Sequence, residues 1–112
     1  MHELSISRSI AETVRRHAEG RPVASVRVEV GHLRQIVPGS LRHCWQLTVA
    51  GTDLDGSDLE VIEIPASIEC LNCATRRELT EPVFRCAFCG SDHVSIASGE
   101  ELTIASYDLA VG

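Results

Sequence analysis

Hydrophobic residues recur at helical spacing over residues 2–19, with Arg and Glu side chains between them. On a helix of about 3.6 residues per turn, most of the apolar positions fall on one stripe. Gly20 and Pro22 then end the pattern. This spacing predicts an amphipathic helix that buries one face. The positions on the stripe are Leu4, Ile6, Ile10, Val14 and Ala18.

Apolar and polar residues alternate strictly over residues 24–30, which is typical of a half-buried strand. Its three valines would face one side, and Ser, Arg and Glu the other. Residues 59–64 predict a second strand, and residues 102–109 a last one, with Leu102 and Ile104 on one face.

A second helix is predicted between the first two strands, because Pro38 suits a first helical turn and Gly51 suits a helix end. This helix would link its flanking strands in parallel. The pattern therefore predicts a mixed α/β fold, with two helices on one face of a small three-stranded sheet. Its residues at helical spacing are Leu41, Cys44, Trp45 and Thr48.

Residues 66–98 interrupt this alternation of elements and contain four of the five cysteines. The chain is expected to leave the sheet at Pro65 and to return near Gly99. We therefore expect an α/β lobe of residues 1–65 and 99–112 that carries an inserted, zinc-ribbon-like lobe of residues 66–98.

Composition narrows the class of protein. The 112 residues include 10 Lys+Arg and 16 Asp+Glu, giving a net charge of −6, and 44% are hydrophobic. A core can therefore form, while an acidic chain is a poor nonspecific ligand for nucleic acid or anionic membranes. No apolar run approaches the ~18 residues of a membrane span, and no secretory signal precedes the first helix, so we expect a cytoplasmic protein.

The cysteine spacing is Cys70-x2-Cys73-x12-Cys86-x2-Cys89, followed by Gly90. Two knuckles with two thiolates each can close a tetrahedron around one zinc ion. The segment has few large apolar side chains, so a metal or a crosslink is expected to stabilise it. A four-thiolate iron site and disulfides in oxidised protein are the alternatives. A catalytic zinc is disfavoured, because four cysteines leave no open coordination position.

Other functions remain open at this point. A zinc-ribbon module that binds nucleic acid or acts as a protein adaptor would use Arg76 and Arg77 between the knuckles, but the acidic balance favours a solvated tip. A thiol oxidoreductase needs an exposed cysteine of low pKa, and zinc would occupy both pairs. We interpret Cys44 as a buried free thiol and Trp45 as a core residue.

The N-terminus carries a second candidate metal site, formed by Met1, His2 and Glu3. The α-amine, the next amide nitrogen and the His2 imidazole can chelate one ion in a plane that suits Ni(II) or Cu(II). Glu3 would add its backbone nitrogen or its carboxylate. The same residues also fit an exposed histidine and a carboxylate that interacts with the helix dipole.

The combination of these features is more specific than any one of them. The chain opens with Met1-His-Glu-Leu-Ser, continues with the strand Val26-Arg-Val-Glu-Val-Gly31 and the helix start Pro38-x-x-Leu41, and ends with the two cysteine pairs. In this order and spacing it resembles, over essentially its whole length, the hydrogenase-maturation nickel metallochaperones of the HypA/HybF family.

The resemblance implies a nickel carrier rather than an enzyme. It implies Ni(II) as labile cargo at His2, with contributions from Met1 and Glu3. The four paired cysteines would hold a structural Zn(II), with His93 the only histidine near them. The implied partners are the large subunit of [NiFe] hydrogenase, in some members urease, and a nickel-insertion GTPase. No nucleic acid or membrane is implied, and a monomer and a homodimer both remain open.

Overall fold

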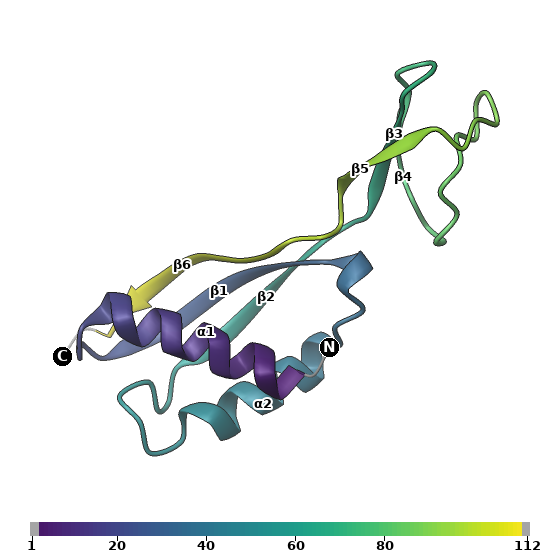
Figure 1. Cartoon of the computed structure of the whole chain (residues 1–112). Helices are drawn as coiled ribbons and strands as arrows, with labels where there is room; N and C mark the ends of the chain where they lie inside the picture. The colour runs from purple at the N-terminus through teal and green to yellow at the C-terminus, as the bar shows by residue number, and fades with distance from the viewer. Residues whose placement is uncertain (1–2, 111–112) are drawn as a thin grey trace.

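The computed structural model describes residues 3–110 of the chain, which form an elongated molecule of 56 × 22 × 17 Å. Two helices and one sheet lie at one end, and a smaller sheet lies at the other (Figure 1). Within this range neither helix is long and apolar enough to cross a membrane. The helices are α1 (Glu3–Ala18), the 3-10 helix η1 (His32–Arg34) and α2 (Pro38–Val49). The strands are β1 (Val23–Gly31), β2 (Asp58–Ile64), β3 (Ser67–Cys70), β4 (Arg76–Glu78), β5 (Val94–Ser98) and β6 (Leu102–Leu109).

The larger sheet has the strand order β2-β1-β6. The central strand β1 pairs with β2 in parallel, where Val28 lies opposite Val61, and with β6 antiparallel, where Val28 lies opposite Ile104. Both helices cover one face of this sheet (Figure 1). The predicted fold class is confirmed, and each predicted helix or strand ends within two residues of its expected limits.

The core lies between this sheet and the two helices. The three valines that face it from β1 are buried, as the alternation predicted. Trp45 is also buried, and its indole N–H donates to the Ser57 carbonyl at 3.2 Å and hydroxyl at 3.1 Å. Two residues are less buried than the sequence predicted. Cys44 is only half-buried, and Leu4, beside the first residue of α1, is 39% exposed.

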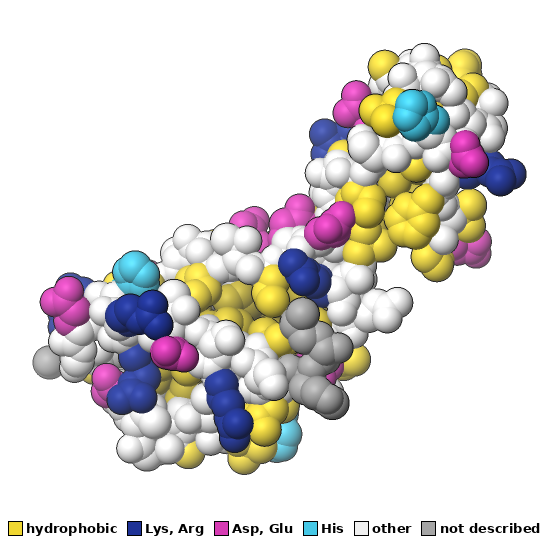
Figure 2. Space-filling view, in the orientation of Figure 1, with side chains coloured by type: hydrophobic (Ala, Val, Ile, Leu, Met, Phe, Trp, Pro, Cys, Tyr) yellow, Lys and Arg dark blue, Asp and Glu magenta, His cyan; other side chains and the backbone are white. Residues whose placement is uncertain are grey.

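The second sheet, of strand order β4-β3-β5, is antiparallel, and the sequence did not predict its strands. It belongs to the cysteine lobe, which we define as β3 to β5 with their loops, residues 67–98. Ile68 is buried in this lobe, but most of its large apolar side chains are exposed, and Phe88 is 83% exposed. Figure 2 shows such side chains gathered on its surface. The apolar core of this lobe is therefore too small to hold it folded alone.

The chain passes between the two sheets beside the end of β1. The Gly31 N–H donates to the Glu101 carbonyl at 2.7 Å, and the Leu33 N–H donates to the Gly99 carbonyl at 2.8 Å. The Arg34 guanidinium donates to the Glu100 carbonyl at 2.7 Å. These bonds attach η1 to the segment that returns from the cysteine lobe.

Candidate metal centre

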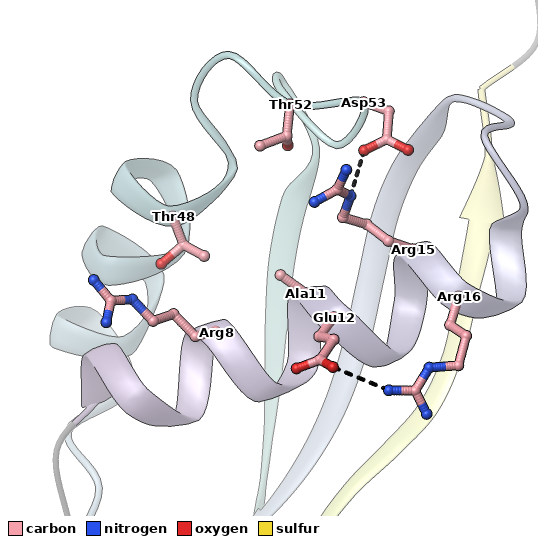
Figure 3. Close-up of a pocket in the computed structure, with 8 residues that line it drawn as sticks. All are labelled: Arg8, Ala11, Glu12, Arg15, Arg16, Thr48, Thr52 and Asp53. Carbon is pink, nitrogen blue, oxygen red and sulfur yellow. Dashed lines mark hydrogen bonds and ion pairs between the residues drawn. The ribbon is translucent and has the colours of Figure 1, made fainter.

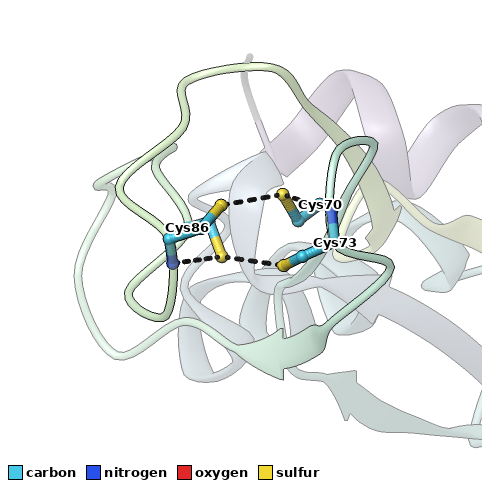
Figure 4. A group of neighbouring side chains, drawn as sticks. Cys70, Cys73 and Cys86 are labelled. Carbon is cyan, nitrogen blue, oxygen red and sulfur yellow. Dashed lines mark hydrogen bonds between the residues drawn. The ribbon is translucent and has the colours of Figure 1, made fainter.

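Four cysteines that lie in pairs along the chain meet at one point of the cysteine lobe (Figure 4). The Sγ atoms of Cys70 and Cys89 lie 3.6 Å apart, and those of Cys73 and Cys86 are separated by the same distance. All four Sγ atoms lie within 4.8 Å of one another. A tetrahedral zinc ion with Zn–S bonds of about 2.3 Å requires S–S edges of about 3.8 Å. The four thiols are therefore arranged to hold one metal ion.

The two knuckles share the same backbone geometry. The residue after each pair adopts a left-handed conformation, with φ of 62° at Ala74 and 75° at Gly90. Its N–H donates to the carbonyl of the first cysteine of the pair at 2.9 Å, to Cys70 in one knuckle and to Cys86 in the other. Glycine adopts this conformation readily, whereas alanine does so at a cost. The glycine at position 90 marks one of these turns in the sequence, whereas Ala74 gives no such signal for the other.

Backbone N–H groups also point at the sulfur atoms. The Cys73 amide lies 3.5 Å from Cys70 Sγ, and the Cys89 amide lies 3.4 Å from Cys86 Sγ. The latter contact is the main reason why the pKa of Cys86 is lowered. Such amides stabilise a thiolate, the form that ligates a metal.

The remaining thiol pKa values diverge because the sulfur atoms are crowded. Thr75 lowers the pKa of Cys73 to about 6, first through its hydroxyl, 3.2 Å from Cys73 Sγ, and then through its amide. The Ser91 amide lowers the pKa of Cys89, but the Cys70 thiol, burial and the other two thiols outweigh it and raise that pKa to about 12. Four adjacent thiolates repel one another, so a divalent cation among them would favour the ionised forms.

The predicted N-terminal site lies partly outside the described residues, because it includes Met1 and His2. Glu3 is described: it is the first residue of α1, it is half-buried, and its carboxylate accepts a hydrogen bond from the Val37 N–H at 3.4 Å. Val37 is the N-cap of α2, so Glu3 places a negative charge at the positive end of that helix. The sequence indicated a metal ligand, or an interaction between Glu3 and its own helix, but not this contact with α2.

The histidines of the described residues are not part of the cysteine cluster. His32, His43 and His93 are exposed. His93 lies four residues beyond Cys89, yet the group of possible metal ligands found among residues 3–110 consists of the four cysteines. The structure therefore gives His93 no place in this group.

A family model described as "Hydrogenase/urease nickel incorporation, metallochaperone, hypA" matches residues 1–109. The chain belongs to the HypA family. A curated relative named hydrogenase maturation factor HypA, from Trichormus variabilis, is 37% identical over 109 residues, which cover 97% of this chain and 96% of the relative. The protein of the same name from Geobacter sulfurreducens is 34% identical, and covers 97% of this chain and 99% of the relative.

Solved structures of HypA proteins have the same fold. The solution structure of the Ni metallochaperone HypA from Helicobacter pylori superposes with a TM-score of 0.70 at 19% identity, covering 100% of both chains. A second solution structure of a HypA protein gives a TM-score of 0.65 at 16% identity, covering 96% of this chain and 92% of that one. At these identities the likeness concerns the fold alone.

Proposed function

We propose that this protein is a nickel metallochaperone that binds Ni(II) at its N-terminus and delivers it to the large subunit of [NiFe] hydrogenase during maturation. The observation that carries the proposal is the family match over residues 1–109, whose description names nickel incorporation into hydrogenase and urease. Urease is therefore a second possible recipient. A nickel-insertion GTPase would act together with this protein. Its compartment would be the cytoplasm, where thiols stay reduced.

The proposed nickel ligands are His2, Met1 and Glu3. The chelate would consist of the α-amine, an amide nitrogen and the His2 imidazole, all of which must lose protons to bind nickel. The reference pKa values are about 6.5 for imidazole and about 7.7–8.0 for the amine. Nickel binding should therefore weaken steeply between about pH 7.5 and pH 6, and one extra residue before Met1 should weaken it as much as His2→Ala does.

Isothermal titration of the tag-free protein with nickel tests this proposal. His2→Ala is expected to lose nickel binding, whereas His43→Ala, which removes an exposed histidine from α2, should bind as the parent protein does. Equal nickel affinity in the parent protein and in His2→Ala would exclude the N-terminal chelate.

We infer further that the four paired cysteines hold a structural Zn(II) and that residues 66–98 form a lobe that depends on it. Support comes from the four-sulfur geometry, which leaves no open position for a substrate, and from the small apolar core. Removing Cys70 should release the metal and unfold this lobe, while the lobe of residues 1–65 and 99–112 stays folded. The matched control is Cys44→Ala, because Cys44 lies on α2, outside the cluster.

Metal analysis and amide hydrogen exchange would measure these outcomes. Cys70→Ala should contain no zinc and should lose protection in β3 and β5, and Cys44→Ala should keep one zinc per chain. A Cys70→Ala protein that retains one zinc and full protection would refute the assignment. Colour in the purified parent protein would indicate iron instead of zinc.

A further inference from the structure

A pocket of about 510 Å³ lies between α1, α2 and the loop that follows α2 (Figure 3). The described residues that line it include neither Glu3 nor any of the four clustered cysteines. Three arginines line it from α1, namely Arg8, Arg15 and Arg16, and two threonines line it from the other side, namely Thr48 and Thr52. All the basic side chains of this protein are arginines, which bind carboxylates in a bidentate manner.

Two of the three arginines that line the pocket form ion pairs within it, and Arg8 does not. Arg16 pairs with Glu12 at 3.1 Å, and Arg15 Nε pairs with Asp53 Oδ1 at 2.7 Å. No carboxylate among residues 3–110 forms an ion pair with Arg8. The five charged side chains that line the pocket therefore sum to +1, in a protein whose net charge is −6.

Several hydrogen-bond donors in the pocket have no partner among residues 3–110. Arg15 pairs with Asp53 through Nε, one of its five N–H donors. Figure 3 shows the guanidinium groups of Arg8 and Arg15 reaching toward the side lined by the threonines. The Thr48 hydroxyl is buried without a hydrogen-bond partner in the described part of the chain, whereas the Thr52 hydroxyl donates to the Val49 carbonyl at 2.7 Å.

The charge distribution selects the kind of ligand. Residues 3–50 contain seven Arg and four Glu, so they carry +3, and the remainder contains three Arg and twelve acidic residues, so it carries −9. A polyanion large enough to extend over the acidic remainder, such as a nucleic acid, would be repelled by it, whereas a short acidic segment can contact the basic region alone. A single carboxylate matches the +1 of the pocket. The pair between Arg15 and Asp53 shows that this wall already holds a carboxylate.

We propose that this pocket receives a carboxylate side chain from an acidic segment of a partner protein, held by the guanidinium groups of Arg8 and Arg15. The groove between α1 and α2 is then a docking surface. Arg8 follows Glu3 by five residues, or about 7.5 Å along the helix axis. A docked partner would lie close to the start of α1, and the relevance of that position to nickel transfer rests on the proposed function.

A peptide titration of the full-length ¹⁵N-labelled protein tests the docking site. The probe is tetraglutamate with both ends blocked, and tetraglutamine of the same length is the comparison peptide. Tetraglutamate should shift the Arg8 and Arg15 Nε–Hε signals and the Thr48 amide saturably, and tetraglutamine should not. Arg8→Gln should weaken binding at least fivefold. Arg42→Gln removes the same charge from an exposed position on α2 outside the pocket, so it should change binding less than twofold.

Two results would overturn the proposal. Equal weakening by Arg8→Gln and Arg42→Gln would mean that the peptide responds only to total charge. Saturable shifts of the same signals by sodium phosphate at equal ionic strength, as large as those from tetraglutamate, would mean a general oxyanion site. Nickel titration separates this outcome from the proposed function, because Arg8→Gln should keep the nickel stoichiometry of the parent protein.

Discussion

Gly31 is the position where we expect the addition of a single methyl group to lower the free energy of unfolding the most. It lies buried at the end of β1, with φ −74° and ψ 144°, so its conformation would suit any residue. Space is the constraint: a Cβ atom here would lie 2.6 Å from the Glu100 nitrogen and closer still to the Gly99 carbonyl. All of these neighbouring atoms belong to the backbone, so Gly31→Ala must push the two segments apart.

The magnitude follows from what must move. Overpacking a tightly packed site costs about 1–3 kcal/mol. Separating the segments also weakens the hydrogen bonds from Gly31 to Glu101 and from Leu33 to Gly99, each worth about 1 kcal/mol. The free energy of unfolding should therefore fall by about 3–5 kcal/mol, a large share of the roughly 5–15 kcal/mol of a typical domain.

Urea unfolding followed by circular dichroism measures this loss, with parent and variants at equal metal content because bound metal adds stability. Gly39→Ala is the matched control. Gly39 lies in α2, and a Cβ atom there meets nothing within 4 Å. Gly39 lies in the first turn of the helix, so alanine should raise the free energy of unfolding by at most about 0.5 kcal/mol. A loss below about 1 kcal/mol for Gly31→Ala would refute the argument from close backbone approach.

Three further substitutions test other parts of the structure. Ala74→Gly should raise the free energy of unfolding of the metal-loaded protein by about 0.5–1 kcal/mol in urea titrations, because it relieves a φ of 62°. Trp45→Phe should lower it by about 2–3 kcal/mol, since it leaves a gap in the core and removes the indole donor to Ser57. Asp108 pairs with Arg27 at 2.9 Å, which lowers the pKa of this carboxyl from 3.8. The stability that this ion pair contributes is therefore present above pH 3.8 and is lost as the pH falls through the lowered pKa. Asp108→Asn should remove this part of the acid dependence of the free energy of unfolding. NMR titration of Asp108 in the parent protein should give a midpoint below pH 3.8.

The larger sheet could be predicted from the sequence because its central strand alternates regularly over residues 25–30. Val26, Val28 and Val30 contribute to one buried face, so the period of two survives in the residue pattern. The cysteine lobe offered no such signal. In β3, Ser67 and Ile68 are both buried, and β4 is exposed along its whole length, so neither strand alternates. Their pairing depends on neighbours farther along the chain, such as Ser98 opposite Ser67.

In the candidate sites too, features set by residues close in sequence could be predicted, and those set by distant residues could not. The convergence of four cysteines was predictable, because each short knuckle brings two thiols together by local geometry and a tetrahedral metal site needs both pairs. The help that Thr75 gives to Cys73 was not, since a hydroxyl two residues away carries no distinctive pattern. The pocket beside Arg8 was also missed, because it forms only when α1 packs against α2.

The contact between Glu3 and Val37 changes how the N-terminal site should be understood. Val37, the N-cap of α2, makes no side-chain capping hydrogen bond to its own helix. The carboxylate that accepts a hydrogen bond from its N–H belongs to the first residue of α1. Glu3 therefore links the starts of two helices. Glu3→Gln keeps an oxygen that can accept the Val37 hydrogen bond but removes the charge. If Glu3 serves only as this link, Glu3→Gln should leave nickel affinity nearly unchanged, while Glu3→Ala, which removes the acceptor, should lower it. If the carboxylate itself binds nickel, both variants should lose affinity, and titration of the pair would tell the two roles apart.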